Sequence, residues 1–164
     1  MSNEHSAPLD DEFQDPLEDY NPKKYEDGVE EALGEQPVAA IMHEPFATVS
    51  ADTKVSAAVQ KLSGFHIACL LVEEDGKLVG VFSDRDVLDR VALEYDDVKD
   101  RCVREVMTSD PVYVYDTDPA AAALSVMAVS GYRHVPIVDA SERIVGIVSP
   151  QRVTAFLRKA FQPE

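Results

Sequence analysis

The chain has 164 residues, 45% of them hydrophobic, which is enough for one ordinary domain with a buried core. Its formal net charge of −16 at pH 7, with no basic stripe, argues against a nucleic-acid-binding protein. We expect a cytoplasmic protein that does not bind membranes. The longest apolar run, residues 67–72, is too short to span a bilayer, residues 1–10 do not resemble a signal peptide, and the two cysteines suggest no disulfide framework.

Residues 1–36 form an acidic segment that carries much of the net charge. The segment holds twelve acidic residues against two lysines, includes three prolines and is poor in β-branched residues. Such a composition buries too little apolar area to offset the entropy cost of ordering. We predict a mostly disordered tail as far as about Tyr25, then a short helix over Glu26–Leu33 that ends at Gly34.

A first folded unit is predicted over residues 37–97. Apolar residues at positions 55, 58, 59 and 62 have the spacing of one helical face. The expected elements in chain order are a strand at 46–49, a helix from Asp52 to Ser63 ended by Gly64, strands at 69–73 and 77–82 joined by a turn at Asp75 and Gly76, and a helix from 83 to 93.

A second unit, residues 98–164, repeats the first. The matching pairs are Met42 with Met107 and Val49 with Val114 at an offset of 65, then Gly80 with Gly146 and Ser83 with Ser149 at an offset of 66. The helix over 119–130 is expected to carry Pro119 in its first turn and to close at Gly131. The chain is therefore one α+β unit written twice.

This duplicated pattern resembles a tandem pair of cystathionine beta-synthase (CBS) domains. The marks that carry the resemblance are MTSDPVYV, GYRHVPIVD and RIVGIVS in the second copy and DGKLVGVFSDRDV in the first. The resemblance covers about residues 37–161. It implies two β-α-β-β-α repeats packed with pseudo-twofold symmetry, two clefts that frequently bind adenine nucleotides, and pairs that assemble into dimers. The sequence itself offers no catalytic set and no metal set, so we expect no enzyme.

The strand-to-helix corner of the first copy carries Ser83 and Asp86 in the family pattern. The resemblance implies that Asp86 binds ribose hydroxyls while Ser83 and the helix N-terminus meet a phosphate. A capping box, in which Asp86 reaches back to the Ser83 amide, explains the same two residues. In the second copy Ser149 keeps its place, but Arg152 replaces the acid. That arginine either grips a phosphate or marks an empty, altered site.

Cations suited to a phosphate stand only in the second copy at the next position of interest. Arg133 and His134 are similar to the phosphate-contacting residues of the gamma subunit of AMP-activated kinase, and the first copy has Ile67 and Ala68 there. One complete site could combine Asp86 with these cations. Purely structural roles for the arginine and the histidine are the alternative.

For the adenine, the resemblance points to Thr48, Val112 and Tyr113 near the first strand of each repeat. We therefore expect a regulatory module that binds an AMP, ADP or ATP type of ligand, with Mg²⁺ beside the more highly charged ones, and that signals to a partner protein through repeat orientation. The alternative is a ligand-free structural homodimer with vestigial clefts. Apolar helix residues such as Leu88 and Phe156 favour a homodimer, unless the helix at 26–33 covers them.

Overall fold

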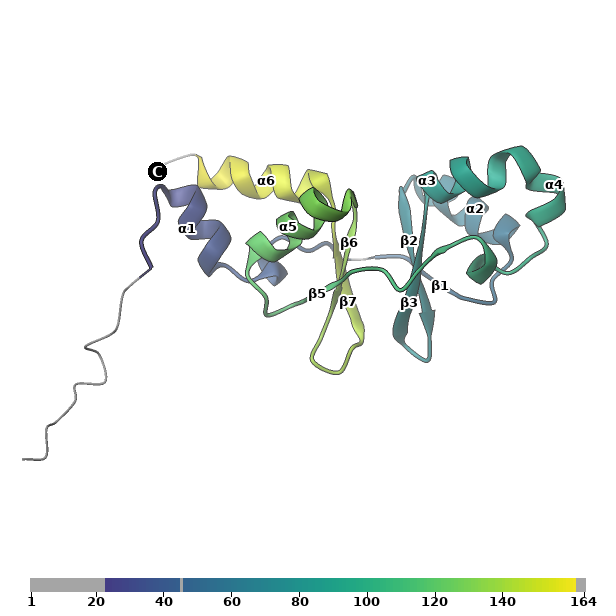
Figure 1. The fold of residues 1–164 in the computed structure, drawn as a ribbon, viewed down its shortest axis with the longest axis horizontal. Helices are drawn as coiled ribbons and strands as arrows, with labels where there is room; N and C mark the ends of the chain where they lie inside the picture. The colour runs from purple at the N-terminus through teal and green to yellow at the C-terminus, as the bar shows by residue number, and fades with distance from the viewer. Residues whose placement is uncertain (1–22, 45, 162–164) are drawn as a thin grey trace, which may run out of the picture.

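The computed structural model describes residues 23–44 and 46–161, and the disorder predicted for residues 1–22 lies outside this part (Figure 1). The elements of the first part of the chain are α1 (Gly28–Glu35), η1 (Val38–Ala40), β1 (Thr48–Ser50), α2 (Val55–Phe65), β2 (Cys69–Glu74), β3 (Lys77–Ser83), α3 (Asp84–Asp86), η2 (Val87–Val91), η3 (Ala92–Glu94) and α4 (Tyr95–Val98). The second part adds η4 (Val103–Glu105), β4 (Thr108–Ser109), β5 (Val114–Tyr115), α5 (Ala120–Ser130), β6 (Val135–Val138), β7 (Ile144–Val148) and α6 (Pro150–Ala160).

Two sheets stand side by side at the centre of the molecule, and the helices lie on the outer flanks (Figure 1). The first sheet has the order β1-β2-β3-β4, and the second has the order β5-β6-β7. In each sheet the outer pair is parallel and the hairpin pair is antiparallel, so the two sheets are built alike. The predicted α+β fold of two like repeats is confirmed.

The two repeats exchange their lead-in segments, which precede the first strand of each repeat. The Val38 N–H donates to the Asp118 carbonyl at 2.7 Å, and at the equivalent place the Val103 N–H donates to the Thr53 carbonyl at 2.8 Å. Strand β4 pairs with β3 of the first repeat, and His43 forms the matching bridge to Ile147. Each hydrophobic core therefore consists of one repeat together with the lead-in segment of the other.

The methionine and glycine marks of the repeat meet across this exchange. A Cβ added at Gly80 would collide with the sulfur of Met107, and a Cβ added at Gly146 would lie 3.0 Å from the sulfur of Met42. Each methionine therefore packs on the glycine of the other repeat. Space for the methionine side chain, rather than a turn, explains a glycine in the middle of each buried strand.

The hairpins β2–β3 and β6–β7 meet at the pseudo-twofold axis. Lys77 and Arg143 occupy the same position in the two repeats, and they form an antiparallel bridge with each other. Two equivalent residues can pair in this way only close to the axis that relates them. The Lys77 ammonium also lies 2.9 Å from Glu142, and a third apolar cluster that includes Leu71, Val81 and Ile147 fills the space between the sheets.

The helix starts predicted at Asp52 and Pro119 are corrected. Helix α2 begins at Val55 and α5 at Ala120, because the residues just before each helix are extended and pair with the exchanged segments. Lys54 bridges to Cys102, and Pro119 bridges to Pro37. Local sequence contains no trace of these partners.

The helix ends predicted at Gly64 and Gly34 are also corrected. Helix α2 continues through Gly64 to Phe65, and His66 caps it in the left-handed conformation with a φ of 52°. Its counterpart Gly131 caps α5 with a φ of 67°, as predicted. Helix α1 continues through Gly34, where a Cβ would lie 3.0 Å from the ring of Tyr25. Gly34 thus provides room for that ring instead of ending the helix.

Helix α1 lies within the predicted acidic tail but belongs to the folded structure. The Asp27 carboxylate caps it by accepting hydrogen bonds from the amides of Val29 and Glu30. The helix lies against α5 and α6 (Figure 1), and Leu33 packs on the second core. A hydrogen bond from the Tyr25 hydroxyl to Glu35 raises the pKa of that tyrosine to about 12. The second repeat's outer helices are thus partly covered, as the alternative to a dimer interface proposed.

The helix predicted from Ser83 to Leu93 is present but irregular. Its winding changes from α3 to a π-helical segment, η2, and then to η3. Leu88 on this path is 70% exposed and Leu93 is 98% exposed. Within the described residues, no helix is both long enough and apolar enough to cross a membrane.

Candidate ligand-binding site

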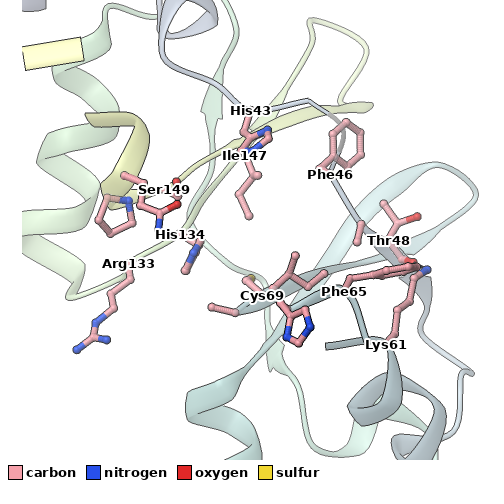
Figure 2. Close-up of a pocket in the computed structure, with 16 residues that line it drawn as sticks. His43, Phe46, Thr48, Lys61, Phe65, Cys69, Arg133, His134, Ile147 and Ser149 are labelled. Atoms are coloured by element: carbon pink, nitrogen blue, oxygen red, sulfur yellow. Dashed lines mark hydrogen bonds between the residues drawn. The ribbon is translucent and has the colours of Figure 1, made fainter. Parts of the chain in front are cut away.

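A large pocket of about 1000 Å³ lies between the two repeats (Figure 2). Phe46, Phe65, Ile67 and Ile147 contribute apolar walls. In Figure 2, Arg133, His134 and Ser149 come from the second repeat, opposite Thr48 and Lys61 of the first. The pocket therefore depends on how the two repeats are placed relative to each other.

The large pocket is cationic although the protein is acidic. Five basic or imidazole side chains line it, and none of the described residues that line it is an aspartate or glutamate; the five are His43, Lys61, His66, Arg133 and His134. The Lys61 ammonium also donates to the Thr48 carbonyl at 2.6 Å, which holds it beside strand β1. Burial, and to a lesser degree the nearby Arg133, lower the pKa of His134, whereas Asp84 acts in the opposite direction. An anion is the charge type that suits this lining.

A small pocket of about 600 Å³ adjoins the large one. Ala68, Cys69, Arg133 and His134 line both pockets. The small pocket also contains Ser83, Asp86 and Thr108, so the structure brings the predicted acid and the predicted cations to one hollow. Aspartates and arginines alternate around it, so its lining has mixed charge.

The Asp86 carboxylate is almost fully occupied by protein groups. One oxygen accepts from the Ser83 amide at 2.9 Å and from the Ser83 hydroxyl at 2.8 Å, and the other accepts from the Thr108 hydroxyl at 2.8 Å. Arg90 lies 3.4 Å away, and Asp86 is only 5% exposed. These are the contacts that the capping alternative describes. A ribose would have to displace them.

Cys69 lies at the junction of the two pockets and carries an unreactive thiol. Burial raises the pKa of Cys69 to about 12, and the nearby Asp86 and Asp84 add to this effect. The thiol therefore stays protonated at neutral pH and contributes apolar surface.

The two corners that correspond to each other by pseudo-symmetry differ in one important respect. In the small pocket, Thr108 bonds to Asp86. The equivalent of Thr108 is His43, and the equivalent of Asp86 is Arg152, which is exposed and does not line the large pocket. Among the described residues, the His43 Nδ1 atom is buried without a hydrogen-bond partner. The large pocket lacks the built-in carboxylate of the small one.

The structure distributes the predicted site residues over three locations. Ser83 and Asp86 line the small pocket, Thr48 and Ser149 line the large pocket, Arg133 and His134 line both, and Arg152, Val112 and Tyr113 line neither. Tyr113 instead packs edge-to-face on Tyr115, with ring centroids 5.8 Å apart. Core packing or aromatic pairing was the alternative for these tyrosines, and no described contact brings Tyr113 to a pocket.

Sequence reasoning missed Lys61 and Phe65 in the large pocket and Thr108 in the small one. Lys61 and Phe65 stand on α2, whose amphipathic pattern reports only its buried face. Thr108 reaches its pocket through the exchanged strand, which local patterns do not reveal. Among the described residues, no group of three or more histidine, cysteine or acidic side chains could hold a metal ion.

The family follows from comparison with known proteins. The CBS domain model matches the chain twice, over residues 38–93 and 103–159, which together exceed half of its length. The chain belongs to the CBS domain family. Both matched segments contain the strand-to-helix corner and the hairpin of one repeat. The lead-in residues from 38 and from 103 fall inside the matches, so the exchange joins two CBS domains.

Curated relatives place such pairs in proteins of different sizes. A homoserine O-acetyltransferase of Methanosarcina acetivorans is 28% identical over 123 residues, which cover 74% of this chain and 22% of that protein. A CBS domain-containing protein of Dictyostelium discoideum is 28% identical over 138 residues, which cover 77% and 94%. The chain spans only about a fifth of the length of the first curated relatives that it matches.

Solved structures share the fold. The structure of CBSX2 in complex with AMP is 23% identical, with a TM-score of 0.68 and coverage of 78% of this chain and 100% of that chain. The CBS domain pair of protein MJ0100 in complex with 5′-methylthioadenosine and S-adenosyl-L-methionine is 24% identical, with a TM-score of 0.65 and coverage of 74% and 99%. At these identities the likeness establishes the arrangement of the two repeats.

Proposed function

We propose that this chain is a regulatory module that binds an adenine nucleotide in the large pocket and transmits binding to a partner protein as a change in repeat orientation. The observation that carries the proposal is the lining of the pocket. Both repeats contribute to it, it is cationic in a chain of net charge −16, and it combines apolar walls with a few polar groups. This combination suits an apolar base that carries a phosphate.

The size and position of the pocket support the same ligand class. A volume of about 1000 Å³ is at the upper end of ordinary small-molecule sites. Two solved CBS pairs have AMP or adenosine-derived thioether ligands in their titles, so adenine ligands are a reasonable first panel for this chain. A ligand that touches Thr48 and Ser149 at once would favour one relative orientation of the repeats.

Calorimetric titration of the full chain with AMP tests the proposal. A Kd near 10 μM would also stabilise the fold by about 2.7 kcal/mol at a hundredfold ligand excess over Kd, which a thermal shift detects. Arg133→Ala should weaken binding about tenfold or more, because it removes a charge-assisted contact. Arg158→Ala, an exposed cation of α6 outside both pockets, is the matched control and should bind normally. Absence of heat and of a thermal shift with AMP, ADP and ATP, with or without Mg²⁺, would contradict the proposal.

A ligand-free homodimer is the second candidate, and two observations favour it. Asp86 is saturated by internal hydrogen bonds, and Leu88 and Leu93 expose most of their surface on the outer face of the first repeat. The second repeat's outer face is partly covered by α1, so the uncovered face is the candidate interface. Sedimentation of the wild type and of Leu93→Asp would decide: a dimer that dissociates in the variant supports this interface, and a monomeric wild type contradicts it.

A further inference from the structure

The inference concerns how the large pocket would read its ligand, and it rests on the proposed function. We propose that the large pocket binds the phosphate of its nucleotide without selecting for the ribose 2′,3′-diol, so that ribose and deoxyribose nucleotides bind alike. The decisive juxtaposition is the corner formed by Ser149, His43 and the start of α6, together with the place that Arg152 takes there.

The small pocket shows what a carboxylate does at this corner. Asp86, at the third position of its helix, accepts from the Ser83 amide and hydroxyl and from Thr108. The large pocket preserves the serine as Ser149, at the start of the 11-residue helix α6, but the Ser149 side chain makes no capping hydrogen bond. The third position is Arg152, which points out of the pocket lining.

The consequence is an acid-free corner. His43, the counterpart of Thr108, has a buried Nδ1 atom without a partner, which is what removal of the carboxylate would leave behind. None of the described residues that line the large pocket is acidic, so no carboxylate is available to accept hydrogen bonds from a vicinal diol. The sugar therefore contributes little to recognition.

The anion contributes instead. Arg133 and His134 present cationic or donor groups, and Lys61 stands across the pocket on α2. The start of α6 adds the positive end of a helix dipole. An aspartate in place of Arg152 would put a negative charge into the region where the ligand phosphate is expected. The residue that separates the two pockets is thus a specificity determinant that acts by leaving the corner vacant.

Competition among three ligands on the full chain tests this inference. AMP and 2′-deoxy-AMP should bind with Kd values within about threefold of each other, whereas adenosine should bind about thirtyfold more weakly because it lacks the charge-assisted contacts. A deoxy ligand that binds tenfold more weakly than AMP, or adenosine that binds as tightly as AMP, would overturn the inference. If neither AMP nor 2′-deoxy-AMP binds, the proposed function itself fails, which is a different result.

Substitution of Arg152 supplies an independent arm. Arg152→Asp should lower AMP affinity about tenfold by repulsion, while the melting temperature holds or rises because His43 and Ser149 gain an acceptor. Arg152→Ala is the control, and it should leave the affinity unchanged because the side chain does not line the pocket. Tighter AMP binding by Arg152→Asp would show that an acid there reads the ribose, and the inference would be wrong.

Discussion

The Thr108 hydroxyl lies 2.8 Å from the Asp86 carboxylate, although the two residues belong to different repeats. The bond exists because strand β4 of the second repeat pairs with β3 of the first. It fixes the exchanged segment at the corner where the second sheet turns towards the small pocket. The same corner of the other repeat has no such bond, and that difference separates the two pockets chemically.

Thr108→Val should therefore lower the free energy of unfolding by about 1–2 kcal/mol, because it removes one donor from a carboxylate that is nearly buried. Urea denaturation measures this change. Thr154→Val on the exposed face of α6 removes a hydroxyl that bonds only within its own helix, and it should change stability by less than about 0.5 kcal/mol. Equal losses in both variants would contradict the role assigned to the bond between the repeats.

Gly80→Ala should destabilise the protein more than Gly146→Ala. The new methyl group at position 80 collides with the Met107 sulfur, whereas at position 146 the nearest Met42 atom is 3.0 Å away. Overpacking of this kind costs about 1–3 kcal/mol, and we expect the upper part of that range only for Gly80→Ala. Chemical denaturation of both variants provides the comparison. A larger loss for Gly146→Ala would show that the methionines do not pack as described.

His66→Gly should raise the free energy of unfolding by about 0.5–1 kcal/mol. The residue has a φ of 52°, a left-handed conformation that glycine adopts without steric cost. Gly131→Ala, at the same position in the other repeat, should have the opposite effect, with a loss of about 1 kcal/mol. Thermal unfolding of the two variants tests the pair. Stabilisation by Gly131→Ala would contradict the assignment of both residues as helix caps.

Stability should fall as the pH drops below 6.5, and His134 should account for part of the fall. Burial lowers the pKa of His134 in the folded state below its ordinary value of 6.5. Above pH 6.5 both folded and unfolded forms are neutral, so the full stability is present. Below that pH the unfolded chain takes up its proton first, and stability is lost until the folded pKa is passed. Urea denaturation of the wild type and His134→Gln at pH 7.5 and 5.5 measures the difference. An identical pH dependence in both proteins would contradict the prediction.

The sequence alone predicts the duplicated unit and much of its secondary structure. Strands β2 and β3 and the turn at Asp75 and Gly76 follow from β-branched content and turn residues, and these signals are local. The offset between Met42 and Met107 and between Gly80 and Gly146 exposes the repeat. What the marks do could not be predicted, because each methionine packs on a glycine of the other repeat.

The exchange of segments also explains the errors. Pro119 has the composition of a first helical turn, yet it is extended because it pairs with Pro37, which is distant in sequence. The partners of Asp86 were open to two interpretations for a related reason. Its amide partner is local and predictable from capping rules, whereas its Thr108 partner arrives from the other repeat. The predictions for Ser149 and Arg152 remain to be tested by binding.

Backbone NMR of the full chain during titration with AMP tests the central claim most directly, because it locates the ligand. The account predicts saturable shifts at the amides of Thr48, His66 and Ser149, which line only the large pocket and come from both repeats. Shifts confined to Thr108 and the start of α3 in the small pocket, or no saturable shifts, would contradict it.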